Sequence, residues 1–198
     1  MNRTGAQLVT TALITLIAFT SAHLLAQTAD QPLPVREHPI APEKNPPGDI
    51  PDNQVFVEYH SPLGFVIKVP EGWARRQTSD RATFSDKYNT IALAVSQHPD
   101  PLTLTSAKQN EISELEKGGR AVRVSGVKSV KPPSGSAVVI RYGSNSELNP
   151  VTNKAIRLEN ERYLFWRNGK LVTLTMSAPF GADNADQWNL MAKSFRWQ

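Results

Sequence analysis

The chain has 198 residues, with 22 Lys+Arg against 18 Asp+Glu, a formal net charge of +4 and a pI near 9.4. This length suits one domain with a tail. The absence of cysteine excludes a disulfide framework, a cysteine-based zinc site, a cysteine nucleophile and a lipid-bearing N-terminal cysteine. With 39% hydrophobic residues and a mean hydropathy of −0.37, the composition indicates a globular chain rather than a disordered or polytopic one.

The first 29 residues have the composition of an export signal. Arg3 is the only charged residue before Asp30, and an apolar run spans residues 8–26. A basic start followed by an apolar run is typical of a secretory signal peptide. As a helix the run would be about 28 Å long, close to the thickness of a bilayer core, so an uncleaved membrane anchor is the alternative. Both interpretations predict a periplasmic or extracellular protein, and the second adds anchoring by residues 8–26.

Residues 30–53 are predicted to be a proline-rich linker. Seven of the 15 prolines fall in this stretch. Proline has a fixed φ and no backbone N–H, so we expect neither a helix nor a central strand here. An extended, solvated spacer is the simpler interpretation, and an arm that docks on a partner is the alternative.

The remaining residues, 54–198, are predicted to form one α+β domain. Short runs rich in β-branched and aromatic residues indicate strands at 55–59, 64–69, 82–85, 90–97, 120–131 and 136–142. A helix is expected over 103–119, where Thr103 or Thr105 can cap the start and Gly118 or Gly119 the end.

The clearest local signal is the segment 162–176, in which two apolar strands flank Asn168 and Gly169. Both turn residues tolerate a positive φ, as a two-residue hairpin requires. Apolar residues on both faces predict a central hairpin that is covered on both sides. A closing helix follows, with Asp183 or Asn184 at its start and a buried stripe at Trp188, Met191, Ala192 and Phe195. Together these elements predict an antiparallel sheet of six or seven strands with two main helices.

Two segments resemble the PsbP-like superfamily. The sequence SPLGFVIKVPEGW at 61–73 is similar to the opening hairpin of that family, and residues 162–195 are similar to its closing hairpin and helix. The resemblance implies an α/β/α sandwich with a central antiparallel sheet. Members of that family include extrinsic photosystem II subunits, a Ran-binding nuclear-transport factor and bacterial envelope proteins. They are mostly binding modules with no shared active site. Bacterial members are often lipoproteins, and this chain departs from them because it lacks the lipid-bearing cysteine.

Motifs that carry catalytic chemistry are missing from the sequence. It has no Gly-x-Ser-x-Gly elbow, no phosphate-binding Gly-x-x-x-x-Gly-Lys loop, no dinucleotide fingerprint and no His-Glu-x-x-His pair. The predicted domain has two histidines, His60 and His98, and both lie beside prolines or at strand ends. We therefore predict no catalytic residue, no metal site and no cofactor. A metal site or an envelope hydrolase built on these two histidines is the minor alternative.

The densest basic cluster, Arg75, Arg76 and Arg81, follows Trp73 and is the predicted partner-binding site. Guanidinium groups beside an aromatic residue suit carboxylates, phosphates or an acidic protein patch. Export removes nucleic acid as a partner, whereas an anionic membrane surface or a cell-wall polymer stays possible. The sequence thus favours a non-catalytic exported domain that acts as a protein-binding or accessory module at the cell envelope. A small-molecule or lipid-binding envelope protein is the alternative.

Overall fold

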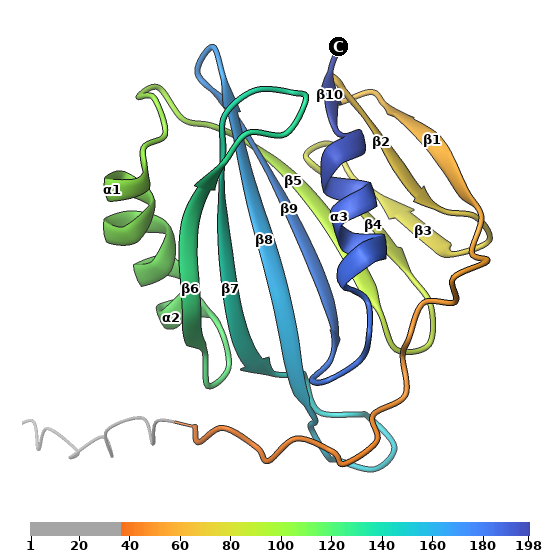
Figure 1. The fold of residues 1–198 in the computed structure, drawn as a ribbon. Helices are drawn as coiled ribbons and strands as arrows, with labels where there is room; N and C mark the ends of the chain where they lie inside the picture. Colours follow the sequence, from red (N-terminus) through yellow and green to blue (C-terminus); the bar gives the residue numbers. More distant parts are fainter. Residues whose placement is uncertain (1–36) are drawn as a thin grey trace, which may run out of the picture. The chain divides into compact units, whose positions relative to one another are not determined.

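An antiparallel sheet of seven strands forms the centre of the structure, a computed structural model that describes residues 37–198 (Figure 1). The strand order is β3-β4-β5-β9-β8-β7-β6, so the two strands of the predicted 162–176 hairpin, β8 and β9, lie inside the sheet. In chain order the strands are β3 (Ala74–Gln77), β4 (Arg81–Ser85), β5 (Thr90–Gln97), β6 (Arg123–Val130), β7 (Ala137–Asn145), β8 (Arg157–Arg167) and β9 (Lys170–Pro179).

One face of this sheet is covered by a second, three-stranded sheet and by α3 (Ala185–Ser194). The second sheet has the order β1-β2-β10 and consists of β1 (Phe56–Ser61), β2 (Phe65–Pro70) and β10 (Arg196–Trp197). Aromatic rings fill the space between the layers, because Phe195 stacks on Phe165 at 4.0 Å and on Phe65 at 5.7 Å between ring centroids. Stacked aromatic pairs of this kind contribute about 0.5–1.5 kcal/mol beyond the area that they bury.

The opposite face packs against a helical segment made of α1 (Leu104–Ser106), a π-helical turn η1 (Ala107–Glu111) and α2 (Ile112–Gly118). Ala107 and Leu115 of this segment join Ile140 and Leu164 of the sheet in a second apolar cluster. Thr103 caps the helix, since its Oγ1 accepts a hydrogen bond from the Ser106 N–H at 3.0 Å. The predicted class, α+β with helices on both faces of an antiparallel sheet, is therefore confirmed.

The predicted two-residue turn between β8 and β9 is present. Asn168 and Gly169 have φ angles of 50° and 77°, and Arg167 pairs with Lys170 across the turn. The two faces of this hairpin belong to different apolar clusters, with Phe165 in one and Leu164 in the other. Successive side chains of a strand point to opposite faces of the sheet, and both faces of this hairpin are covered, so neighbouring residues are apolar.

Residues 37–53 form no helix or strand, as their prolines predict, but they lie against the sheet domain and are named the strap here. Ile50 is buried in the main core, and its N–H donates to Asn184 Oδ1 at 2.6 Å. Asn184 stands at the start of α3, yet its side chain makes no capping bond and instead holds the strap. The strap is therefore not a solvated spacer. The predicted domain boundary at residue 54, which implies that residues 54–198 fold without the strap, stays a prediction.

The predicted export signal or anchor, residues 1–29, and the first residues of the predicted linker lie outside the described residues. Among residues 37–198, no helix is long and apolar enough to cross a membrane.

Candidate functional site

The predicted arginine cluster occupies one edge of the seven-stranded sheet. Arg75 and Arg76 are on β3, the terminal strand, and Arg81 opens β4. All four residues of β3 are exposed. The three arginines thus lie on a hairpin of two strands, in whose turn Thr78 Oγ1 donates to Asp80 Oδ1 at 2.8 Å.

Strand pairing separates these three arginines into two groups. Arg75 pairs with Phe84, so it shares the core side of the sheet, and its guanidinium lies 5.8 Å from the ring centroid of Tyr59. Arg76 pairs with Thr83, and Arg81 with Ala94, on the opposite face. Residues that pair across a ladder share a face, and diagonal neighbours are about 7–8 Å apart, so Arg76 and Arg81 stand together there.

The arginines of this hairpin have no acidic partner in the part of the chain that the structure describes. Within residues 37–198, Arg75, Arg76 and Arg81 make no ion pair. The outer side of β3 also has no neighbouring strand in this part of the chain, which leaves alternate backbone N–H and C=O groups unpaired. An extended acidic segment can bind an edge of this kind in two ways at once. Its backbone pairs with the free edge of the strand, and its carboxylates bind the arginines.

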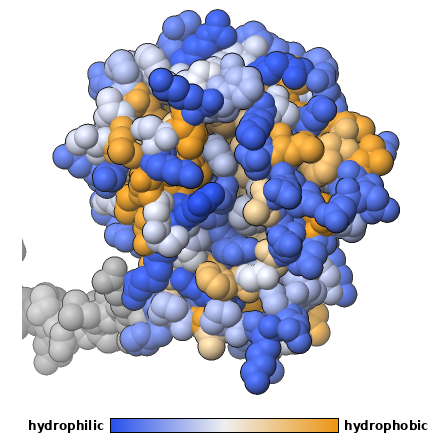
Figure 2. Space-filling view, in the orientation of Figure 1, coloured by the Kyte–Doolittle hydropathy of each residue, from blue (hydrophilic) through white to orange (hydrophobic). Residues whose placement is uncertain are grey.

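Sequence reasoning missed a second feature, a groove between α3 and strands β6, β7 and β8. It consists of two adjoining cavities of about 400 and 560 Å³ that share Arg141, Glu161 and Ala185 in their walls. The groove opens on the face that bears α3, where hydrophilic side chains predominate and hydrophobic ones form smaller groups (Figure 2). At 400–560 Å³ per cavity, the groove is large enough for a small ligand.

Three polar side chains at the middle of the groove satisfy one another. Arg141 and Glu161 are opposite each other on β7 and β8, and Arg141 Nε donates to Glu161 Oε1 at 2.5 Å. The Tyr163 hydroxyl donates to Glu161 Oε2 at 3.0 Å. Burial, with the neighbouring Glu161 carboxylate, raises the pKa of Tyr163 well above its usual range. The phenol therefore keeps its proton and acts as a donor.

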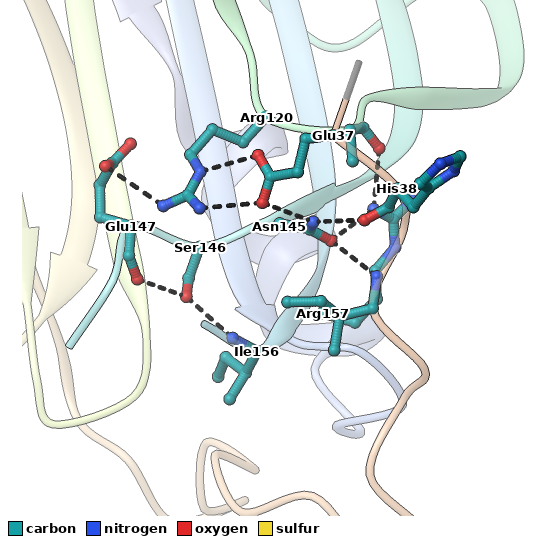
Figure 3. A network of polar contacts seen from close by, with 10 residues as sticks. Glu37, His38, Arg120, Asn145, Ser146, Glu147, Ile156 and Arg157 are labelled. Carbon is teal, nitrogen blue, oxygen red and sulfur yellow. Dashed lines mark hydrogen bonds and ion pairs between the residues drawn. The ribbon is translucent and has the colours of Figure 1, made fainter. Parts of the chain in front are cut away.

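At the strap end of the groove lies a buried guanidinium, that of Arg157. Its Nη1 donates to Ala121 O at 2.8 Å and to Asn145 Oδ1 at 3.2 Å (Figure 3). The group lies over Gly143, where a Cβ atom would be 2.5 Å from Nη2, so a larger residue here would displace the guanidinium. Burial, followed by the charge of Arg123, lowers the pKa of Arg157.

The strap and Arg157 are joined through one side chain, Asn145. Its Oδ1 accepts from the Ile40 N–H at 3.0 Å, and its Nδ2 donates to Glu37 Oε1 at 3.0 Å and to His38 O at 2.9 Å (Figure 3). Glu37 in turn binds Arg120 with two hydrogen bonds of 2.8 and 3.0 Å. Strap, β7 and β8 thus meet in one network beside the groove.

The two histidines weighed as ligands or catalysts have ordinary surroundings. His60 Nε2 is 3.5 Å from Glu58 Oε2 on the exposed strand β1, and His98 Nδ1 is 2.7 Å from Asp100 O. Among residues 37–198, no three side chains of the kind that bind metals come together.

One sequence signal for the groove was available. On β8, Arg157, Glu159 and Glu161 occupy alternate positions, which puts three ionisable residues on one face of a central strand. Charged side chains on a face that is otherwise apolar indicate a cleft or a buried network, because an ionised group is not left unpaired in a core. Their partners on β6 and β7 come from another part of the chain, so the sequence alone does not identify them.

No protein-family model and no curated protein matches this sequence. The fold is similar to that of CyanoP, the cyanobacterial PsbP of Synechocystis sp. PCC 6803, with 16% identity, a TM-score of 0.51, and coverage of 76% of this chain and 98% of that chain. It is also similar to the Ran-binding protein Mog1p of Saccharomyces cerevisiae, with 13% identity, a TM-score of 0.52, and coverage of 73% and 96%. The chain therefore has the PsbP-like fold that its two motif segments predict.

Proposed function

We propose that this chain, on its PsbP-like fold, is a non-catalytic accessory module of the cell envelope that binds a protein partner through Arg75, Arg76 and Arg81. The observation that carries the proposal is the open β3 edge, where three exposed arginines make no ion pair within residues 37–198. An exposed strand edge invites pairing with another chain. The envelope location rests on the export signal predicted for residues 1–29.

The chemistry of the edge defines the partner as an extended acidic segment. Such a segment would add a strand to β3 through backbone hydrogen bonds and place carboxylates beside Arg76 and Arg81. On the same face, Thr83, Ala92 and Ala94 are half-exposed and small, so a partner can approach the sheet closely. Arg75 contributes less, because its guanidinium already lies over Tyr59.

Two further points support a binding role. The fold is shared with Mog1p, which is by name a Ran-binding protein. In the groove, Arg141, Glu161 and Tyr163 are hydrogen-bonded to one another rather than held ready as a nucleophile and its base.

The direct test is photo-crosslinking in the native host. A photoreactive amino acid replaces Ala74 in the full-length chain, because this exposed β3 residue lies on the same face as Arg76 and leaves the arginines in place. The control carries it at position 167, at the distant β8–β9 turn. We expect one reproducible envelope protein to cross-link at position 74 and not at 167. Purified partner should then bind the Arg76→Gln/Arg81→Gln variant at least tenfold more weakly, since each charge-assisted hydrogen bond contributes about 1.5–3 kcal/mol.

The Arg167→Gln variant removes an exposed arginine elsewhere and should leave the affinity within twofold. A partner that binds wild type and the double variant equally would refute the β3 edge as the contact. Recovery of phospholipid or cell-wall polymer alone, with no protein, would refute a protein partner and favour an anionic surface instead.

A further inference from the structure

We propose that the end of the groove at Arg123 and Arg157 binds an oxyanion, a carboxylate or phosphate group, carried by a ligand whose apolar part lies against Phe180 and Trp188. All four residues line the 560 Å³ cavity. This site is separate from the β3 edge and goes beyond the protein-binding function proposed above.

The first argument is the unpaired, buried guanidinium of Arg157. The residue is 8% exposed, and both of its hydrogen bonds use Nη1. Its Nε and Nη2 have no protein partner within residues 37–198, and no carboxylate of this part of the chain lies within ion-pair distance. These two nitrogens keep some access to the cavity, while the rest of the side chain is buried. A charge that is largely shielded from water and has no counter-charge is unfavourable, so an anionic ligand in the cavity would stabilise it.

A second cation reinforces the first instead of neutralising it. Arg123 on β6 pairs with Gly143, the residue over which the Arg157 guanidinium lies. The charge of Arg123 is felt at Arg157, where it works in the same direction as burial to lower the pKa. One guanidinium can bind a carboxylate or phosphate with two parallel hydrogen bonds, and Nε and Nη2 of Arg157 are left for this purpose. Arg123 adds a second positive charge to the same cavity.

The acid closest in strand register is directed elsewhere. Glu159 also pairs with Gly143, from the β8 side, but burial raises the pKa of its carboxyl, and the groups that also shift it are the backbone of Gly181 and the carboxylates of Glu161 and Asp183, not either arginine. It forms no ion pair with Arg123 or Arg157. The two arginines thus remain available to an external anion.

The apolar wall defines the rest of the ligand. Phe180 is 42% exposed although it is a large hydrophobic residue, and Trp188 and Ala182 lie beside the same cavity. Pockets that bind small molecules combine such walls with a few polar groups that fix the orientation. An amphiphilic anion, with the oxyanion at the arginines and an alkyl or aromatic part at Phe180, fits this arrangement.

Calorimetric titration of the full-length protein tests the site with defined probes. Inorganic phosphate, acetate and octanoate represent free ligands, and vesicles of phosphatidylglycerol, against phosphatidylcholine vesicles, represent a lipid headgroup. We expect saturable binding of one octanoate per chain, tighter than acetate because of the apolar wall. Binding of phosphatidylglycerol vesicles without octanoate or phosphate binding would assign the anion to a lipid instead of a free ligand.

Two variants locate the binding in the chain. Arg123→Gln removes one exposed cation and should weaken octanoate at least tenfold, which corresponds to 1.4 kcal/mol. Gly143→Ala keeps every charge but places a Cβ in the space of the Arg157 guanidinium, and it should weaken binding to a similar degree. Arg167→Gln, with the same loss of charge as Arg123→Gln, should stay within twofold of wild type.

The proposal is overturned if neither the soluble anions nor the anionic vesicles bind saturably. Equal affinities of wild type, Arg123→Gln and Gly143→Ala would overturn it as well. Should Gly143→Ala fail to fold, Arg123→Gln decides, because Arg123 is exposed and, among the described residues, donates only to the carbonyl of its neighbour Val122. Either result is independent of partner binding at the β3 edge.

Discussion

Arginine occurs in two contrasting settings in this domain. At the β3 edge, Arg75, Arg76 and Arg81 are close together in the sequence and exposed to solvent. In the groove, Arg123 and Arg157 come from strands far apart in the sequence, and Arg157 is buried. Neither group is neutralised by carboxylates of residues 37–198. The exposed cluster can therefore be recognised from the sequence, whereas the groove arginines come together only in the folded chain. Substitutions at the two sites should have different effects on stability.

The largest difference is expected in stability. Arg157→Ala removes the donor to Ala121 O and Asn145 Oδ1 and the buried stem of the side chain, and it should lower the free energy of unfolding by about 3 kcal/mol. Arg76→Ala, on the exposed edge, should change it by no more than about 0.5 kcal/mol. Urea unfolding followed by tryptophan fluorescence measures both. Equal losses in the two variants would mean that the contrast between buried and exposed arginine has no energetic consequence.

The connection between strap and groove gives the next effect. Asn145→Ala removes the four hydrogen bonds that join Ile40, Glu37 and His38 to β7 and Arg157. Because Asn145 is buried, we expect a loss of about 2 kcal/mol in unfolding free energy. Hydrogen exchange should also show that the Ile40 amide loses its protection while β8 amides keep theirs. Unchanged protection at Ile40 would show that the strap is held independently of Asn145.

Local patterns were enough to predict much of the sheet. The Asn168-Gly169 turn, the strands around it and the Thr103 cap depend on residues adjacent in sequence, and the structure has them. Strand β3 was missed because Ala74-Arg75-Arg76-Gln77 has no alternation of apolar and polar residues. Its extended conformation depends on pairing with β4 and not on its own β propensity. Strand β10, at two residues, is too short to show a period.

The strap and the groove needed tertiary information. Prolines correctly exclude a hydrogen-bonded ladder for residues 37–53, but they do not exclude side-chain contacts such as that of Ile50 in the core. The groove is formed where β6, β7 and β8 pass α3, so its arginines are related by strand register and not by spacing in the sequence. Only Arg75, Arg76 and Arg81, which lie on adjacent strands of one hairpin, formed a cluster that a sequence could show.

A smaller effect on stability should come from substitution of Glu159, which lines the groove. Burial, followed by the nearby carboxylates of Glu161 and Asp183, raises its pKa above that of an ordinary glutamate, although the backbone of Gly181 opposes this. A raised pKa means that the ionised form disfavours folding, and this penalty appears as the pH rises above the ordinary glutamate value, about 4.3, and is complete above the folded pKa.

Glu159→Gln should therefore be slightly more stable than wild type at pH 7 and equal to it at pH 3.5. The variant should also bind octanoate a few-fold more tightly, because one negative charge leaves the cavity. Urea midpoints across this pH range measure the first effect, with the exposed strap residue Glu43 changed to Gln as the control. A Glu159→Gln stability difference that does not vary with pH would contradict the assignment to ionisation.

The smallest expected effect is acid release of the strap, and it separates the strap network from the β3 edge. Hydrogen bonds from Arg120 and then Asn145 lower the pKa of Glu37. A lowered carboxyl pKa gives a stabilisation that is present above the ordinary glutamate value and is lost as the pH falls through the folded pKa. The protection factor of the Ile40 amide, which is its exchange rate relative to the intrinsic rate at the same pH, should therefore fall as the pH drops below the ordinary glutamate value in wild type. In Glu37→Gln this protection factor should be low at every pH, while Glu43→Gln and Arg76→Gln should follow wild type, since neither residue contacts the network. Acid sensitivity that persists unchanged in Glu37→Gln would place the titrating group elsewhere.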